Sequence, residues 1–143
     1  MNHAVWRVSA PDLDVDAFLS RFPELQGKAR GWRQGAQGLG GMFNASSGFT
    51  LSLADTDSFR EALDAARDFF TTRAPLLEAL RELGASSLLD VGLVVHAPED
   101  ERWVRNLRLT AGDLDWLARA GVDFELTLYP PDGDEPRASP TGA

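Results

Sequence analysis

The sequence has no cysteine and only one lysine, two histidines and one tyrosine among its 143 residues. Without cysteine, neither a disulfide framework nor a thiolate zinc site can form. No apolar run approaches the roughly 18 residues needed to cross a bilayer. The first residues, MNHAVWRVSA, lack the basic start and apolar run of a signal peptide. We therefore expect a cytoplasmic protein that does not associate with membranes.

Basic side chains are also scarce. The chain has 14 lysines and arginines but 22 acidic residues, so its net charge is −8. Nucleic-acid binding needs a basic surface that releases counterions from phosphate, so this balance argues against a nucleic-acid partner. An acidic surface suits a protein that binds a basic partner. A requirement for solubility would explain the charge equally well.

The hydrophobic pattern of the chain predicts alternating strands and helices. Period-2 alternation or continuous apolar runs predict strands at 3–10, 49–55, 86–97, 103–110 and 122–129. Helical spacing and capping residues predict helices at 12–22, 55–70, 76–83 and 111–121. Pro75 is expected to separate the two middle helices because it lacks an amide proton. Gly84 is expected to close the second of them.

Individual faces of these elements can also be predicted. The helix at 55–70 should bury Phe59, Leu63, Ala66 and Phe70, and the helix at 111–121 should bury Leu114, Leu117 and Ala118. In the last strand the residues expected to face inward are Val122, Phe124, Leu126 and Leu128. The run at 86–97 is nearly continuous in apolar residues, which is typical of a central strand buried on both faces.

The predicted fold class is α+β. The direct step from the strand at 86–97 to the one at 103–110 favours a single mixed or mostly antiparallel sheet of about five strands, with helices packed mainly on one face. Residues 1–129 should form one domain. The tail at 130–143 is rich in proline, glycine and aspartate, and we expect it to be disordered.

The glycine-rich stretch GWRQGAQGLGGMFNASSG (31–48) does not match a nucleotide-binding loop. A dinucleotide fingerprint that starts at Gly38 and Gly40 ends on Phe43, and the stretch leads into a strand rather than a helix. Around Ser46 the nucleophile-elbow pattern lacks its first glycine. We expect this segment to be a flexible crossover or a lid.

Two acidic clusters are weak candidates for a metal site. DLDVD (12–16) lacks the glycine and the glutamate of a calcium loop, so its acids fit a helix start better. HAPEDE (96–101) joins one histidine with three acids, whereas metal sites usually draw on more histidines or cysteines. We expect no cofactor, no metal and no catalytic residues.

Trp32 is the most conspicuous candidate binding residue, because Arg30 and Arg33 flank it in the glycine-rich stretch. Tryptophan and arginine together are typical of binding hot spots. Alternatively, Trp32 folds back as a buried plug under its own loop. The candidate binding residues are Arg30, Trp32, Arg33 and His96.

The C-terminal segment LRLTAGDLDWLARAGVDFELTLY (107–129) and the helix PLLEALRELGA (75–85) carry a resemblance to a known family. In these segments the chain resembles the bacterial domain of unknown function 4279 family, most clearly over residues 76–129. The resemblance implies no catalytic residues. Some small, acidic, cysteine-free bacterial proteins of this type are immunity proteins, which bind and neutralise a toxin.

These observations favour a non-enzymatic protein-binding module, for example an immunity protein for a co-encoded bacterial toxin. The alternative is a small-ligand-binding protein or enzyme that uses residues 31–48 as a lid, with Arg30, Arg33 and His96 near a pocket. A third interpretation is a structural subunit that forms a homo-oligomer through the edge of its sheet.

Overall fold

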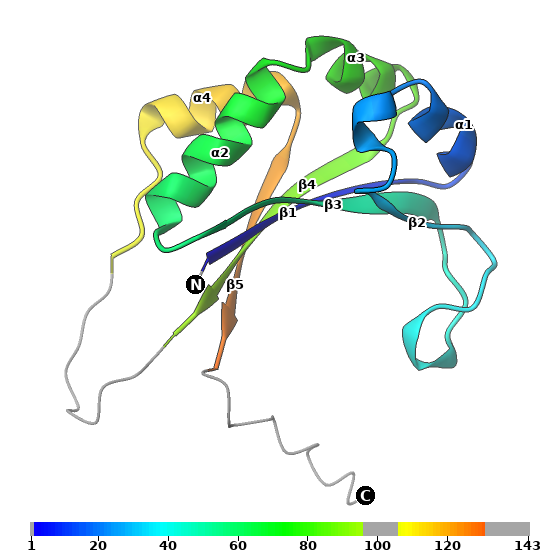
Figure 1. Cartoon of the computed structure of the whole chain (residues 1–143), viewed down its shortest axis with the longest axis horizontal. Helices are drawn as coiled ribbons and strands as arrows, with labels where there is room; N and C mark the ends of the chain where they lie inside the picture. The colour runs from blue at the N-terminus through cyan, green and yellow to red at the C-terminus, as the bar shows by residue number, and fades with distance from the viewer. Residues whose placement is uncertain (1, 96–105, 131–143) are drawn as a thin grey trace, which may run out of the picture.

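Five strands form one mixed sheet in the computed structural model, which describes residues 2–95 and 106–130 (Figure 1). The strands are β1 (Asn2–Ala10), β2 (Arg30–Trp32), β3 (Ser47–Thr56), β4 (Ser86–Val94) and β5 (Asp123–Tyr129). Their order across the sheet is β2-β3-β1-β4-β5. All pairs are antiparallel except β4 with β5, which is parallel. The predicted α+β class with a mixed, mostly antiparallel sheet is confirmed.

The helices of the described residues lie together on one face of this sheet, and the opposite face carries none of them (Figure 1). They are α1 (Val15–Ser20), α2 (Phe59–Thr71), α3 (Ala74–Glu82) and α4 (Ala111–Ala120). Two short 3-10 turns also occur, η1 (Pro23–Leu25) after α1 and η2 (Leu39–Gly41) in the segment between β2 and β3. Because β4 and β5 are parallel, the chain needs a crossover between them, and α4 supplies it on the helix side.

The core lies between the sheet and the helices and is centred on Trp6 of β1. Its ring meets Phe49, Phe69 and Phe70 edge to face, at centroid distances of 5.5, 5.6 and 5.4 Å. The indole N–H of Trp6 donates to the Ser87 hydroxyl at 2.6 Å, so its one polar atom is satisfied inside the core. The predicted alternation of β1 is confirmed, with Ala4, Trp6 and Val8 buried in this core.

The two middle helices are confirmed, although α2 begins at Phe59 and residues 55 and 56 belong to β3. The Ser58 hydroxyl accepts from the backbone N–H of Glu61 at the start of α2, and the predicted buried stripe from Phe59 to Phe70 is buried. Pro75 lies in the first turn of α3 and separates it from α2. Gly84 follows α3 with a positive φ of 64°, as a helix-terminating glycine does.

The predicted strand at 103–110 is wrong for residues 106–110, which form no regular secondary structure. Residues 103–105 lie outside the described residues. Both edges of β4 are already occupied, by β1 and β5, so no edge is left there for a further strand. Leu107 and Leu109 pack against the core instead and lead into α4.

The predicted burial along α4 and β5 needs correction as well. In α4 the buried residues are Asp113, Trp116 and Leu117, whereas Leu114 is 56% exposed. In β5, Phe124 packs on Phe59 of α2, but Leu126 and Leu128 are 37% and 60% exposed. A buried ion pair sets the face of α4, as described below. For β5 the cause is its position at the sheet edge, where the helices do not cover its far end.

Candidate functional site

The helix-free face of the sheet presents side chains from all five strands in register. One row across the sheet runs Arg30, Thr50, Arg7, Leu88, Asp123, and the next runs Ser52, Val5, Asp90, Glu125. Alternate residues of a strand share a face, so these side chains point away from the helices. The face therefore carries arginines toward β2 and acids toward β5.

A groove of about 800 Å³ crosses this face, and we call it the open-face groove. Its lining residues are Val5, Arg7, Ser9, Trp32, Thr50, Ser86, Ser87, Leu88, Asp123, Phe124 and Glu125. Neighbouring strands lie about 4.8 Å apart, so the distance from β2 to β5 is roughly 19 Å. An extended peptide of about six residues spans that distance.

The floor of the sheet next to the groove holds a nearly buried carboxylate. The Asp90 side chain is 6% exposed, although it belongs to the face without helices. It accepts from the Arg7 guanidinium at 3.2 Å and from the Thr127 hydroxyl at 2.7 Å. Arg7 is half exposed and makes only this one ion pair among residues 2–95 and 106–130. Its remaining donors can therefore meet a ligand in the groove.

The β5 end of the groove is acidic. Asp123 and Glu125 are exposed, and neither forms an ion pair with another described residue. Two carboxylates on one face of a strand attract a cationic group, and their field strengthens where water is partly excluded. The groove thus offers a negative end at β5.

Trp32 forms the opposite end of the groove, and Arg30 lies beside it on the same outward face of the short strand β2. Trp32 is half-buried, which places it between the two predicted alternatives of hot spot and plug. Its ring packs over Gly48 of β3, where an added Cβ would lie 2.6 Å from the ring and 2.1 Å from the Val8 carbonyl oxygen. Only glycine fits at position 48 without displacing Trp32.

Arg33 points elsewhere, so the structure does not bring all the candidate residues together. Its guanidinium pairs with Asp16 at the start of α1. His96, with the rest of HAPEDE, lies outside the described residues. Arg30 and Trp32 are the two candidates that share the open face.

The segment from 33 to 46 projects from the sheet on the side opposite the helices (Figure 1). It is closed by backbone hydrogen bonds, with the N–H of Gly35 donating to Asn44 and that of Gly38 to Met42. Met42 and Phe43 at its tip are 76% and 74% exposed. The predicted crossover is thus a hydrogen-bonded hairpin-like loop with an apolar tip. A second cleft, of about 680 Å³, lies between this loop and Trp32.

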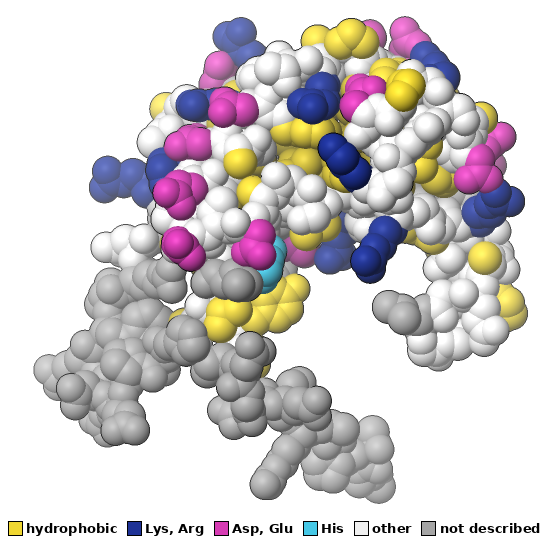
Figure 2. All heavy atoms as spheres, viewed as in Figure 1, with side chains coloured by type: hydrophobic (Ala, Val, Ile, Leu, Met, Phe, Trp, Pro, Cys, Tyr) yellow, Lys and Arg dark blue, Asp and Glu magenta, His cyan; other side chains and the backbone are white. Residues whose placement is uncertain are grey.

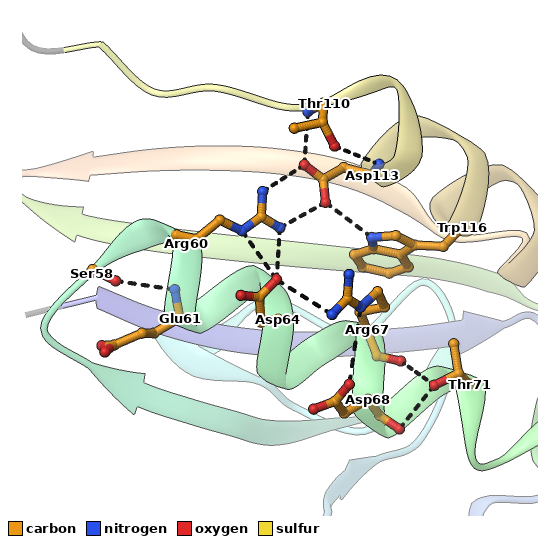
Figure 3. A network of polar contacts seen from close by, with 10 residues as sticks. All are labelled: Ser58, Arg60, Glu61, Asp64, Arg67, Asp68, Thr71, Thr110, Asp113 and Trp116. Carbon is orange, nitrogen blue, oxygen red and sulfur yellow. Dashed lines mark hydrogen bonds and ion pairs between the residues drawn. The ribbon is translucent and has the colours of Figure 1, made fainter.

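A second polar cluster joins α2 to α4 within the helix layer (Figure 3). Arg60 donates twice to the Asp113 carboxylate, at 2.7 Å to each oxygen. The same carboxylate accepts from the Thr110 backbone N–H at 2.8 Å and the Trp116 indole N–H at 3.3 Å. These bonds, led by the one from Arg60, hold the pKa of Asp113 well below its usual value of 3.8, although burial opposes this.

This cluster is structural in character because the Asp113 carboxylate finds all of its donors inside the protein. Asp113 also completes a reciprocal capping box with Thr110 at the start of α4. Together these bonds turn Asp113 inward, which explains why the buried face of α4 differs from the predicted one. Elsewhere on α2 and α4, acidic and basic side chains are intermixed at the surface (Figure 2).

Sequence reasoning did not find Arg7 and Asp90. One signal was present: Asp90 interrupts the otherwise apolar run SSLLDVGLVV, and a carboxylate in a buried strand needs a cation or a hydrogen-bond donor. The partner could not be read from the sequence, since Arg7 is 83 residues away and one of many arginines.

No protein-family model, no curated protein and no solved structure matches the chain. Among residues 2–95 and 106–130, no three histidine, aspartate or glutamate side chains lie close enough to hold a metal ion. The helices of the same residues are all too short or too polar to cross a bilayer.

Proposed function

We propose that this chain is a non-enzymatic protein-binding module whose partner presents a basic surface to the open-face groove. The observation that carries the proposal is the extent of the groove, with Trp32 at one end and Asp123 and Glu125 at the other. An extended polypeptide of about six residues contacts both ends at once. A tryptophan with neighbouring arginines is a common composition of protein-binding hot spots.

The charge of the chain supports the same partner. A net charge of −8 steers a basic protein toward this molecule and repels another acidic one. The biological role that we propose is that of an immunity protein, which neutralises a co-encoded bacterial toxin by covering it. The resemblance to the domain of unknown function 4279 family stays a prediction.

The test is a binding measurement with charge-reversal variants. The chain is co-expressed with the products of its neighbouring genes, and any co-purifying protein is identified and titrated against the purified chain by calorimetry. We expect one-to-one binding of a basic protein, weakened at least tenfold by Glu125→Lys because a cation then faces the partner's cations. The matched control is Glu82→Lys, an exposed glutamate of α3.

Two outcomes contradict the proposal. One is the absence of any stoichiometric protein partner. The other is an equal loss of affinity in Glu125→Lys and Glu82→Lys, which would show a general charge effect with no role for the groove.

A small-ligand receptor is the second candidate function, and the cleft between Trp32 and the 33–46 loop favours it. Trp32, Arg33 and Asn44 are among its lining residues, so an aromatic wall and polar groups converge there. This cleft does not include Glu125. A ligand bound there is insensitive to Glu125→Lys, and the same titration therefore separates the two functions.

A further inference from the structure

Strand β5 lies at the edge of the sheet with little of the usual protection of an edge strand. Among residues 2–95 and 106–130, no strand pairs with its outer side. Edge strands are commonly blunted by charged side chains, proline or a bulge. β5 (DFELTLY) has two acidic residues but no lysine, proline or bulge, and it pairs with β4 over seven residues in one unbroken register. Leu126, Leu128 and Tyr129 on it are 37%, 60% and 46% exposed.

The backbone of β5 presents hydrogen-bonding groups along that outer side. The Tyr129 carbonyl accepts from the Val95 N–H at 2.9 Å, so the peptide groups of Tyr129 turn toward β4. Neighbouring residues of a strand direct their N–H and C=O groups to opposite sides. The peptide groups of Phe124, Leu126 and Leu128 therefore face outward, ready to bond another strand.

The side chains of β5 are complementary to those of the same strand run in the opposite direction. In an antiparallel pairing centred on Leu126, that residue faces its own copy and Leu128 faces Phe124. In the same register Glu125 faces Thr127 and Asp123 faces Tyr129. Every apolar residue thus meets an apolar residue, and each carboxylate meets an uncharged residue rather than another carboxylate.

We propose that two copies of this chain pair through β5, antiparallel and centred on Leu126, to form one continuous ten-stranded sheet. This register uses all seven residues of the strand, because Leu126 is its middle residue. It also joins Phe124, Leu126 and Leu128 of both copies into one apolar row on the helix side of the sheet. A register centred on Glu125 places a carboxylate against itself, which destabilises the pair.

The pairing leaves the open-face groove accessible, since it extends the sheet sideways and covers neither face. It is therefore independent of the proposed function. The net charge of −8 on each copy opposes association at low ionic strength. Added salt screens this repulsion, so it strengthens the dimer, whereas a contact between a basic peptide and the β5 acids weakens with salt.

The test is the mass of the full chain in solution, by sedimentation equilibrium across a range of concentrations at two salt concentrations. We expect twice the mass of one chain, and a dimer dissociation constant at least tenfold larger for Leu126→Lys because two ammonium groups then meet at the symmetry axis. Leu114→Lys is the matched control, an exposed leucine on α4 that should leave the dimer intact. A monomer at all concentrations, or an undiminished dimer in Leu126→Lys, overturns the proposal.

A second measurement tests the register and does not depend on a disruptive lysine. The chain lacks cysteine, so Leu126→Cys carries one thiol per copy. Facing residues of an antiparallel pair have Cα atoms about 5.5 Å apart, within the range that a disulfide spans. We expect Leu126→Cys to cross-link under mild oxidation at least tenfold faster than Leu114→Cys. Equal rates, or faster cross-linking of Glu125→Cys than of Leu126→Cys, overturn this register.

Discussion

Two aspartates, Asp113 and Asp90, are each almost buried and each paired with a half-exposed arginine, yet the two pairs differ in how completely they are satisfied. Arg60 donates two hydrogen bonds of 2.7 Å to Asp113, and Thr110 and Trp116 donate one more each to the same carboxylate. Arg7 meets Asp90 through one bond of 3.2 Å. The first pair joins two helices, and the second lies on the face without helices.

This difference in hydrogen bonding distinguishes Arg60–Asp113, a structural ion pair, from Arg7–Asp90, whose arginine keeps free donors. A bidentate pair in which every lone pair has a donor holds its elements in one arrangement. A guanidinium with one long bond keeps donors for a ligand, and its carboxylate keeps it in position. Under the proposed function, the same two residue types serve stability in the helix layer and recognition on the open face.

Removing the arginine from the helix-layer pair should have the largest effect. Arg60→Ala leaves the buried Asp113 carboxylate without its cation, and we expect a loss of about 3 kcal/mol in the free energy of unfolding. This loss is at the lower end of the range for removing one partner of a buried ion pair. The reason is that Arg60 is 42% exposed and that Thr110 and Trp116 still donate to Asp113. Urea denaturation measures it. A loss below about 1 kcal/mol would contradict the structural role.

Removing the open-face arginine should matter less for stability and more for binding. Arg7→Ala admits water to Asp90 from the groove, so we expect a loss of about 1–2 kcal/mol in the free energy of unfolding. Affinity for the partner should fall about tenfold or more, while Arg60→Ala should leave affinity unchanged under conditions in which it is folded. Urea denaturation and calorimetry on both variants test this. Weaker binding by Arg60→Ala together with unchanged binding by Arg7→Ala would contradict these roles of the two ion pairs.

The pH dependence of stability should show the smallest effect. Asp113 has a pKa lowered by folding, so its pair stabilises the fold above the ordinary pKa of 3.8 and loses that contribution as pH falls. The difference in unfolding free energy between wild type and Asp113→Asn should shrink by about 1 kcal/mol from pH 5 to pH 3. Urea denaturation at both pH values measures it. A difference that stays constant would mean that folding does not lower this pKa.

The sequence predicted those parts of the fold that depend on local pattern. The alternation in β1 and the capped, striped helix α2 follow from neighbours within a few residues, and both were correct. The buried face of α4 was predicted incorrectly, because the hydrogen bond from Arg60 turns Asp113 inward. Arg60 lies 53 residues from Asp113, so a local pattern does not reveal this contact. Likewise, Leu126 and Leu128 alternate with polar residues as core residues do, and burial was therefore predicted for them. They are exposed because β5 lies at the edge of the sheet, which only the strand order shows.

The candidate site was predicted in part for the same reason. Arg30 and Trp32 were selected by composition, and the structure places both on the open face. β2 has only three residues, too few for alternation to show which side chains share a face. The pairing of Arg7 with Asp90 depends on strand order, which an isolated sequence does not display.

The central place of β1 in the sheet also bears on how the chain is synthesised. β1 leaves the ribosome before both of its neighbours, β3 and β4, which end at residues 56 and 94. One edge therefore lacks its partner until residue 56 has been made, and the other until residue 94. Such pairing between distant segments is slow and exposes unpaired strand edges to other chains. The nascent protein is thus most vulnerable to aggregation before β4 emerges, when its future central strand still has an open edge.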